Sequence, residues 1–208
     1  MTRVLLIDSP VANSASIARA LRAAGADLQI SSDPDDVRRA SRLVLPGVGT
    51  FGAAMSWLRR TGNDDAIRDA VARGAALLGI CVGHQLLFDG SEEWGAGEDT
   101  GAPYGGLGLI RGIVRKLACS LPVPQIGWNR VKWTGASTRL FDGIADSTPF
   151  YFVHSYAATS CDAEVASAAY GVSFTAAVQQ ANVFGVQFHP EKSSAAGLRI
   201  LRNYVMMQ

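Results

Sequence analysis

Short apolar runs alternate with amphipathic segments along the first half of the chain. Each apolar run of strand length precedes a segment whose apolar residues recur every three or four positions, as on one face of a helix. The expected strands are Val4–Asp8, Leu28–Ile30, Leu43–Leu45 and Ala75–Leu78, and the expected helices are Ser14–Ala24, Pro34–Ala40, Phe51–Leu58 and Asp64–Arg73. This alternation predicts an α/β fold with a mostly parallel, doubly wound central sheet flanked by helices.

The second half of the chain is richer in strands. The expected strands there are Leu107–Leu117, Val123–Trp133, Phe150–Tyr156, Val165–Tyr170, Thr175–Gln180 and Phe184–Phe188, followed by a final helix at Ser193–Val205. We expect the first two of these strands to pair with each other. The Gly-, Glu- and Asp-rich segment Ser91–Gly106 is the best candidate for a mobile loop. Because no repeat or linker interrupts the pattern, we predict a single domain over residues 1–208.

Composition narrows the class of protein. The 208 residues are 48% hydrophobic and carry a formal net charge of +1 without a basic run, so we expect no nucleic-acid partner. No apolar stretch approaches the ~20 residues of a membrane span, and Met1-Thr2-Arg3 leads directly into the first strand without the features of a signal peptide. Three cysteines without C-x-x-C spacing favour neither structural disulfides nor zinc. A reducing, cytoplasmic location is therefore expected.

Cys81 lies between two glycines in Gly79-Ile80-Cys81-Val82-Gly83, after a predicted strand and before a predicted helix at His84–Phe88. This order of strand, sharp turn and helix matches the nucleophile elbow of hydrolases, with sulfur in place of oxygen. The glycines allow the strained backbone of such a turn, and a helix N-terminus favours the thiolate. A cysteine in an apolar stretch is also a common core residue, so a catalytic assignment depends on partners.

A base and its orienting carboxylate are candidates at the end of another predicted strand. His189-Pro190-Glu191 directly follows Phe184–Phe188. If that strand runs parallel to the strand before Cys81, His189 and Cys81 share the edge where sites form in open α/β sheets. His189 could then take the thiol proton, and Glu191 could hold the other ring nitrogen. A histidine before a proline is otherwise more often structural.

A third loop, Pro46–Gly49, follows the strand Leu43–Leu45. Its glycine-bracketed turn could direct backbone amides at a developing oxyanion, together with the amide of Val82 after the nucleophile. Residues 47–52 also satisfy G-x-G-x-x-G, but the acidic residue that a dinucleotide site needs ~20 positions later is missing from the end of the next strand. His-x-Glu is not a zinc spacing either. We therefore expect acyl transfer through a thioester, with neither metal nor cofactor.

The ordered motifs Gly79-Ile80-Cys81-Val82-Gly83-His84-Gln85 and His189-Pro190-Glu191 resemble those of the class I glutamine amidotransferases. The resemblance implies a flavodoxin-like fold in which Cys81 attacks the carboxamide of L-glutamine and forms a γ-glutamyl thioester. Ammonia leaves with a proton from His189, and water then releases glutamate. The implied substrate-binding residues are Gly47, Gln85, Ser155 and Tyr156, and the implied oxyanion amides are those of Val48 and Val82.

Further motifs resemble one branch of this family, the glutaminase subunits of imidazole glycerol phosphate synthase. They are Leu45-Pro46-Gly47-Val48-Gly49-Thr50-Phe51, Ser91-Glu92-Glu93, Gly106-Leu107-Gly108-Leu109-Ile110, Gly127-Trp128-Asn129 and Glu191-Lys192-Ser193. The branch implies a (β/α)8-barrel cyclase partner that uses the ammonia to form imidazole glycerol phosphate and aminoimidazole carboxamide ribonucleotide in histidine biosynthesis. The implied interface residues are Asn13, Trp128, Asn129, Tyr151 and Lys192. Since the glutaminase fold uses essentially all 208 residues, the ammonia acceptor is expected to be a separate chain.

The chain departs from this branch in three places. Asp8–Asn13 lacks two glycines that are usual in the first loop and gains a proline, His84 stands where methionine is usual, and Gln125 replaces a common histidine. Two alternatives therefore stay open. One is a paralogous subunit that feeds ammonia to a surface-sugar amidination enzyme, and the other is a non-catalytic regulatory subunit with the same fold. From the flexible loop Gly47–Gly49 we also expect low activity of the isolated chain.

Overall fold

A mostly parallel sheet forms the centre of the protein. The structure, a computed structural model, describes residues 2–9, 14–94, 103–135 and 138–207. Within these residues the main sheet contains β1 (Thr2–Ile7), β2 (Ala26–Ser31), β3 (Arg42–Leu45), β4 (Ala76–Ile80), β9 (Lys132–Trp133), β12 (Glu164–Tyr170), β13 (Val172–Gln180) and β14 (Val183–Val186). Their order is β2-β1-β3-β4-β14-β13-β12-β9, parallel from β2 to β14 and antiparallel beyond. The predicted mostly parallel α/β sheet is confirmed.

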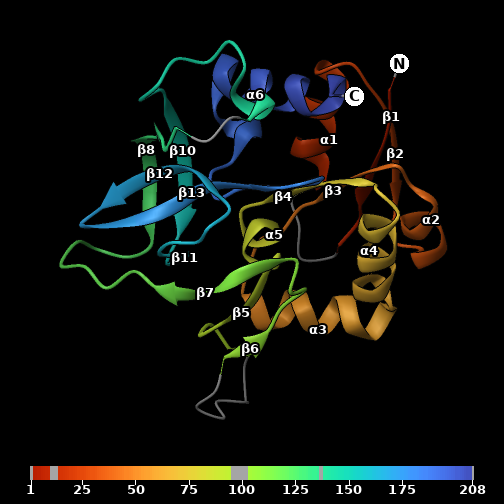
Figure 1. Cartoon of the computed structure of the whole chain (residues 1–208), viewed down its shortest axis with the longest axis horizontal. Coiled ribbons are helices and arrows are strands. Elements are labelled where there is room, and N and C mark those ends of the chain that lie inside the picture. Colours follow the sequence, from red (N-terminus) through yellow and green to blue (C-terminus); the bar gives the residue numbers. More distant parts are fainter. Residues whose placement is uncertain (1, 10–13, 95–102, 136–137, 208) are drawn as a thin grey trace.

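Helices cover both faces of this sheet. They are α1 (Ser14–Ala23), α2 (Pro34–Arg39), α3 (Phe51–Thr61), α4 (Asn63–Ala72), α5 (Val82–Gln85) and α6 (Ser194–Met206), with short 3-10 turns η1 (Arg139–Phe141) and η2 (Pro190–Lys192). Helices α1 and α6 lie on one side of the sheet, and α3 and α4 lie on the other (Figure 1). Residues 4–7 and 43–45 are buried at every position, because covered parallel strands have no solvent-facing side. In the described part of the chain, no helix has the length and apolar character needed to cross a membrane.

Two smaller sheets lie beside the main one in the described residues. Their strands are β5 (Phe88–Ser91), β6 (Tyr104–Gly105), β7 (Ile110–Lys116), β8 (Gln125–Arg130), β10 (Pro149–His154) and β11 (Tyr156–Ala158). The expected pairing of Leu107–Leu117 with Val123–Trp133 is wrong, because β8 pairs with β10 while β7 pairs with β11 and β5. The cause is a break at Ser155, which divides the expected strand Phe150–Tyr156. The first half, β10, pairs with β8, and the second half, β11, pairs with β7. The strand edges through which β7 and β8 could pair with each other are therefore occupied.

The helix after Cys81 is also shorter than expected. Helix α5 ends at Gln85, and Phe88, the expected end of this helix, begins β5 instead. Phe88 pairs with Ile110 of β7, and its side chain is wholly buried. This pairing spans more than twenty residues, so the local apolar pattern could not reveal it. Of the expected loop Ser91–Gly106, the part at 95–102 lies outside the described residues, and its other end contains β6.

Four phenylalanines hold the sheet of β8 and β10 against the end of β14. Phe150 stacks on Phe188 with ring centroids 4.1 Å apart, and Phe152 meets Phe188 and Phe174 edge to face. All four side chains are wholly buried, and burying each one contributes roughly 2–3 kcal/mol of hydrophobic free energy. Since Phe188 immediately precedes His189, this cluster fixes β10 beside the turn that carries the candidate base.

Candidate active site

Cys81 occupies a strained turn between β4 and α5. Its backbone has φ 56° and ψ −112°, and such conformations cost a non-glycine residue of order 1–3 kcal/mol. The flanking glycines are also required by space. A Cβ on Gly79 would lie 2.5 Å from the Gly83 carbonyl oxygen, and a Cβ on Gly83 would overlap the Leu45 carbonyl oxygen. The turn thus has the geometry of a nucleophile elbow, with the thiol at its apex.

His189 follows β14, which runs parallel to β4. Val186 pairs with Ile80, so the segments after the two strands emerge at the same edge of the sheet. His189 Nδ1 is 2.8 Å from Glu191 Oε1, and both side chains are almost wholly buried. Burial lowers the pKa of His189, but hydrogen bonds with Cys81 and Glu191 and the negative charges of these partners outweigh it and raise this pKa to about 10. The structure therefore brings together the thiol, the candidate base and the candidate orienting carboxylate.

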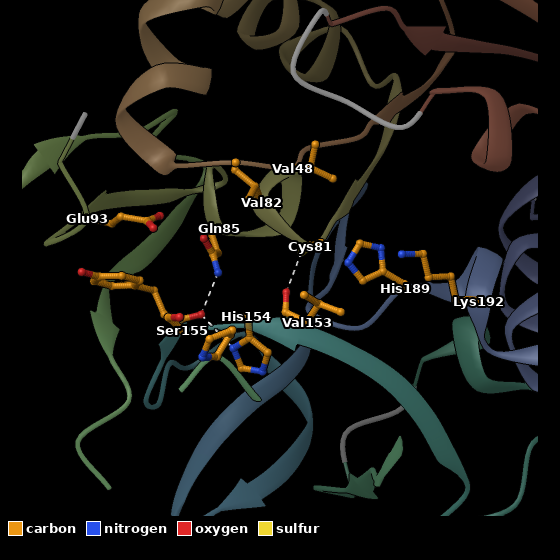
Figure 2. A pocket seen from close by; sticks show the side chains of 13 residues that line it. Val48, Cys81, Val82, Gln85, Glu93, Val153, His154, Ser155, His189 and Lys192 are labelled. Carbon is orange, nitrogen blue, oxygen red and sulfur yellow. Dashed lines mark hydrogen bonds between the residues drawn. The ribbon is translucent and has the colours of Figure 1, made fainter. Parts of the chain in front are cut away.

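A cavity of about 250 Å³ opens in front of Cys81 (Figure 2). It is lined by Val48, Gly49, Cys81, Val82, Gln85, Glu93, Pro124, Val153, His154, Ser155, Tyr156, His189 and Lys192. The thiol of Cys81 donates a hydrogen bond to the Val153 carbonyl oxygen at 3.7 Å, and the side chain of Gln187 donates to the sulfur at 3.9 Å. The volume of this cavity is at the small end for ligand cavities, which suits a molecule the size of an amino acid.

The loop after β3 forms one wall of this cavity. Val48 and Gly49 line it, and Gly49 has φ +84°, which glycine adopts without strain. Gly47 lies behind them, packed so closely on the elbow that a Cβ there would be 2.6 Å from the Gly83 amide nitrogen. Val82 begins α5, and Figure 2 shows it near Val48 on one side of the cavity. The oxyanion role of Val48 and Val82 and a substrate contact of Gly47 stay predictions.

Polar side chains also line the part of the cavity that lies away from the thiol. Gln85, Ser155 and Tyr156 line it, as the resemblance implied, and Gln85 Nε2 donates to the Tyr156 carbonyl oxygen at 2.7 Å. Glu93 also lines it and lies toward the opposite end from His189 in Figure 2. Burial raises the pKa of Glu93, and the amide of Phe51, which donates to Glu93 Oε2 at 2.9 Å, opposes that rise. Glu93 belongs to the branch motif Ser91-Glu92-Glu93, but no place in the cavity was expected for it from the sequence, because nothing local indicates that its loop folds back onto α3.

Comparisons with known proteins show the family of the chain. Residues 5–207 match the sequence model of the family described as "Glutamine amidotransferase class-I". The chain belongs to the class I glutamine amidotransferases. This amidotransferase is 46% identical over 211 residues to "Imidazole glycerol phosphate synthase subunit HisH" of Symbiobacterium thermophilum, an alignment that covers 100% of the chain and 95% of the relative. It is 42% identical over 206 residues to the protein of the same name from Moorella thermoacetica, covering 98% of the chain and 94% of the relative.

Solved structures share the fold of the amidotransferase at much lower identity. The solved structure titled "Structure of PurLQS from Thermotoga maritima" superposes with a TM-score of 0.77 over 98% of each chain at 18% identity. One titled "Crystal structure of glutamine amidotransferase" gives a TM-score of 0.72 over 96% of each chain at 20% identity. At these identities the likeness concerns the fold alone.

Two further histidines of the amidotransferase are buried and neutral. His84 on α5 is wholly buried, and neither ring nitrogen has a hydrogen-bond partner among the described residues. Burial, with the nearby His154, lowers the pKa of His84 to about 3. Burial also lowers the pKa of His154 to about 4, against the opposing hydrogen bond of its Nδ1 with the Tyr156 carbonyl oxygen at 2.9 Å. His154 lines the cavity, whereas His84 packs edge to face on Phe88 beneath the elbow.

Three of the implied interface residues form one exposed cluster beside the cavity. Trp128 of β8 is 54% exposed and meets Tyr151 of β10 edge to face at 6.1 Å, and the Lys192 ammonium lies 5.7 Å from the centre of the Tyr151 ring. Asn129 points elsewhere, since its Nδ2 donates to the Ala169 carbonyl oxygen of β12. Asn13 lies outside the described residues. An interface role for these residues stays a prediction.

The N-terminus of α3 carries a carboxylate of the protein itself. The amide of Phe51, the first residue of α3, donates to Glu93. In a dinucleotide fold a phosphate occupies this position, so the G-x-G-x-x-G match at residues 47–52 has the wrong surroundings for that site. Within the described chain, no group of three or more His, Cys, Asp or Glu side chains is placed to hold a metal ion.

Proposed function

We propose that the chain hydrolyses L-glutamine to glutamate and ammonia and supplies the ammonia to a partner enzyme. The observation that carries this proposal is the buried His189–Glu191 pair, 2.8 Å apart, at the sheet edge that presents Cys81 in its strained turn. A thiol activated by an oriented imidazole is the nucleophile–base pair of thioester chemistry. Membership of the class I glutamine amidotransferases makes the carboxamide of glutamine the group that it attacks.

We propose the following sequence of steps for these groups. The raised pKa of His189 favours transfer of the Cys81 proton to its ring, and the resulting sulfur anion attacks the carboxamide carbon. The amides of Val48 and Val82 receive the negative charge of the tetrahedral oxygen. The protonated His189 gives its proton to the leaving ammonia, which leaves a γ-glutamyl thioester. His189 then deprotonates a water that hydrolyses the thioester, while Glu191 accepts the hydrogen bond from Nδ1 and keeps the ring in orientation throughout.

The far end of the cavity suits the α-amino acid end of the substrate. Glu93 lies across the cavity from His189, and its carboxylate is partly buried, so an ammonium group there would be paired in a poorly solvated place. Ser155 and Tyr156 offer polar groups beside it for the α-carboxylate. L-asparagine is shorter by one methylene, so a cavity that holds glutamine between Glu93 and Cys81 would keep the asparagine carboxamide away from the sulfur when its ammonium is on Glu93. Asparagine should therefore be a much poorer substrate.

The exposed face of β8 and β10 is evidence for a partner that binds over the mouth of this cavity. Ile126 is 64% exposed and Trp128 is 54% exposed on β8, and opposite them on β10 lie Val153 and Tyr151. Val153 also lines the cavity, so an apolar surface is continuous with the site. Ammonia released into water would be largely protonated and lost as a nucleophile. The relatives' names and the implied interface therefore favour the (β/α)8-barrel cyclase of imidazole glycerol phosphate synthase as the acceptor in histidine biosynthesis.

Reconstitution tests this function. The purified chain is mixed with a (β/α)8-barrel cyclase subunit of imidazole glycerol phosphate synthase, and glutamate release is measured with and without the cyclase and its nucleotide substrate. We expect slow release by the chain alone, much faster release in the loaded complex, and one cyclised product per glutamate. Full-rate release without a partner would contradict the proposal, as would a cyclase that forms no product from glutamine. Growth of a deletion strain without histidine would instead indicate the surface-sugar paralogue.

A further inference from the structure

Gln187 is a wholly buried polar side chain next to the nucleophile. It follows β14, two residues before His189, and its backbone amide donates to the Ala176 carbonyl oxygen of β13 at 2.9 Å. A buried carboxamide costs several kcal/mol unless its polar atoms are hydrogen-bonded. Both ends of Gln187 are bonded: its Oε1 accepts from Gln85 Nε2 at 3.0 Å, and its Nε2 donates to Cys81 Sγ at 3.9 Å.

A backbone carbonyl determines which end of Gln187 faces the sulfur. The Tyr156 carbonyl oxygen can only accept, and it receives a hydrogen bond from Gln85 Nε2 at 2.7 Å. The Gln85 carboxamide must therefore present its NH₂ group there, and the second hydrogen of this NH₂ group reaches Gln187 Oε1. Since Gln187 presents its oxygen to Gln85, its own NH₂ group must face Cys81. The orientation follows from the Tyr156 carbonyl and does not depend on the assignment of either side-chain amide alone.

The two hydrogen bonds of the sulfur favour different protonation states. The contact with the Val153 carbonyl oxygen at 3.7 Å needs a proton on sulfur. Once His189 has taken that proton, the carbonyl oxygen and the sulfur anion repel each other, and Gln187 Nε2 is the donor that remains. Hydrogen bonds to charged groups are about twice as strong as neutral ones, and those at catalytic centres often tighten only when charge develops. The 3.9 Å contact is long beside a protonated sulfur and should shorten on the thiolate.

We infer that Gln187 stabilises the Cys81 thiolate through its side-chain NH₂ group, and that Gln85 positions Gln187 for this role. The inference deepens the proposed function and rests on it, since it concerns the same sulfur. It gives Gln85 a second task besides lining the substrate cavity. It also explains why a glutamine interrupts the otherwise apolar run of residues 183–188, where an apolar side chain would pack without a desolvation cost.

Alkylation of Cys81 across the pH range tests the inference without relying on turnover. All three cysteines are free thiols, so Cys119 and Cys161 are replaced by serine and the full chain is treated with iodoacetamide. Gln187→Met removes the donor at similar volume. We expect the pH of half-maximal alkylation to rise by about one unit, and kcat for glutamine with the partner present to fall about tenfold with KM changed less than twofold.

Gln187→Glu and a surface variant complete the design. Gln187→Glu keeps an oxygen for Gln85 but replaces the donor by a carboxylate, so it should raise the pH of half-maximal alkylation at least as far as Gln187→Met. Gln180→Glu, at an exposed position of β13, is the matched control and should leave the pH profile unchanged. If either folded Gln187 variant alkylates with the wild-type pH profile, the inference is wrong, and Gln187→Glu decides the matter if Gln187→Met does not fold. A shifted profile combined with glutaminase activity that survives Cys81→Ala would overturn the proposed function and leave the inference on Gln187 standing.

Discussion

Acid should unfold this protein through two histidines that are buried without charge. The pKa of His84 is lowered from 6.5 to about 3 by burial, with a further contribution from His154, and the pKa of His154 is lowered to about 4, chiefly by burial. In the unfolded chain both rings become protonated as the pH falls below 6.5, whereas in the folded chain they stay neutral. The unfolded state therefore binds more protons, and the free energy of unfolding decreases as the pH falls.

The size of this effect follows from the two lowered pKa values. Each histidine that is neutral in the folded state and protonated in the unfolded state lowers the free energy of unfolding by a little over 1 kcal/mol for each pH unit of acidification. The two together lower it by about 3 kcal/mol per unit. Between about pH 6.5 and pH 4.5 the loss reaches roughly 5 kcal/mol, comparable with the whole stability of many domains. His189 offsets little of this loss, because its raised pKa keeps it protonated in the folded state and the unfolded histidine is itself mostly protonated below pH 6.5.

Urea denaturation at a series of pH values measures the slope. His84→Met is the informative variant, since methionine fills a similar space and packs well on the Phe88 ring. It removes one of the two titrations and both unpartnered ring nitrogens. We expect its slope below about pH 6 to be smaller than that of the wild type by a little over 1 kcal/mol per pH unit. Carboxylates that titrate nearby contribute equally to both proteins and cancel in the difference.

Two results would refute this reasoning. Equal slopes for the wild type and His84→Met would mean that His84 titrates in the folded protein much as it does in the unfolded chain. A wild-type protein that gains stability as the pH falls from about 6.5 to 5.5 would contradict the sign of the effect. In either case the buried, unpartnered environment of His84 would have to be replaced by one with water or a hydrogen-bond acceptor.

Three other changes test the geometry of the site. Gly83→Ala should lower the free energy of unfolding, measured by urea denaturation, by several kcal/mol and abolish most of the activity, because the new Cβ would overlap the Leu45 carbonyl oxygen. The control Gly74→Ala, at φ +94° with free space around it, should lower the free energy of unfolding by only about 1–2 kcal/mol and leave the activity intact. Glu93→Gln should raise KM for glutamine about tenfold or more, because the ammonium loses its charged partner; an unchanged KM in steady-state assays would place the ammonium elsewhere. Trp128→Ala should weaken cyclase binding, measured by titration calorimetry, about tenfold or more, since exposed aromatic residues are frequent interface hot spots. The melting temperature of the free chain should stay within a few degrees. Unchanged affinity would mean that the face of β8 and β10 is not the interface.

The parallel half of the fold could be predicted from the sequence, and the candidate site only in part. Strands such as Leu43–Leu45 are apolar at every position because both faces of the sheet are covered, and the alternation with helices then requires parallel connections. Whether the segments after β4 and β14 share one edge depended on the direction of β14, which follows the antiparallel strand β13 and which the alternation does not determine; the structure makes β14 parallel to β4. The elbow was predictable for a local reason, because Gly79 and Gly83 are the residues that a tight strand-to-helix turn requires.

The second half could not be predicted in the same way, because its strands are paired by contacts between distant segments. The break at Ser155 and the pairing of Phe88 with Ile110 leave no signal in the local apolar pattern. Glu93 reaches the cavity only because its loop folds back onto the first amide of α3. Gln187 did leave a signal, a single polar residue in an apolar strand two positions before the base, but its meaning needs the carbonyl of Tyr156 to orient the chain of amides.

The role of Cys81 as the nucleophile is tested most directly by Cys81→Ala in the complex with the cyclase. Product formation is measured twice, once with glutamine and once with ammonium salt at a pH where free ammonia is available. The account predicts that the variant forms no product from glutamine while it forms product from ammonia at the wild-type rate, and that serine at Cys119 or Cys161 changes neither rate. Glutamine-dependent synthesis that persists in Cys81→Ala would contradict it.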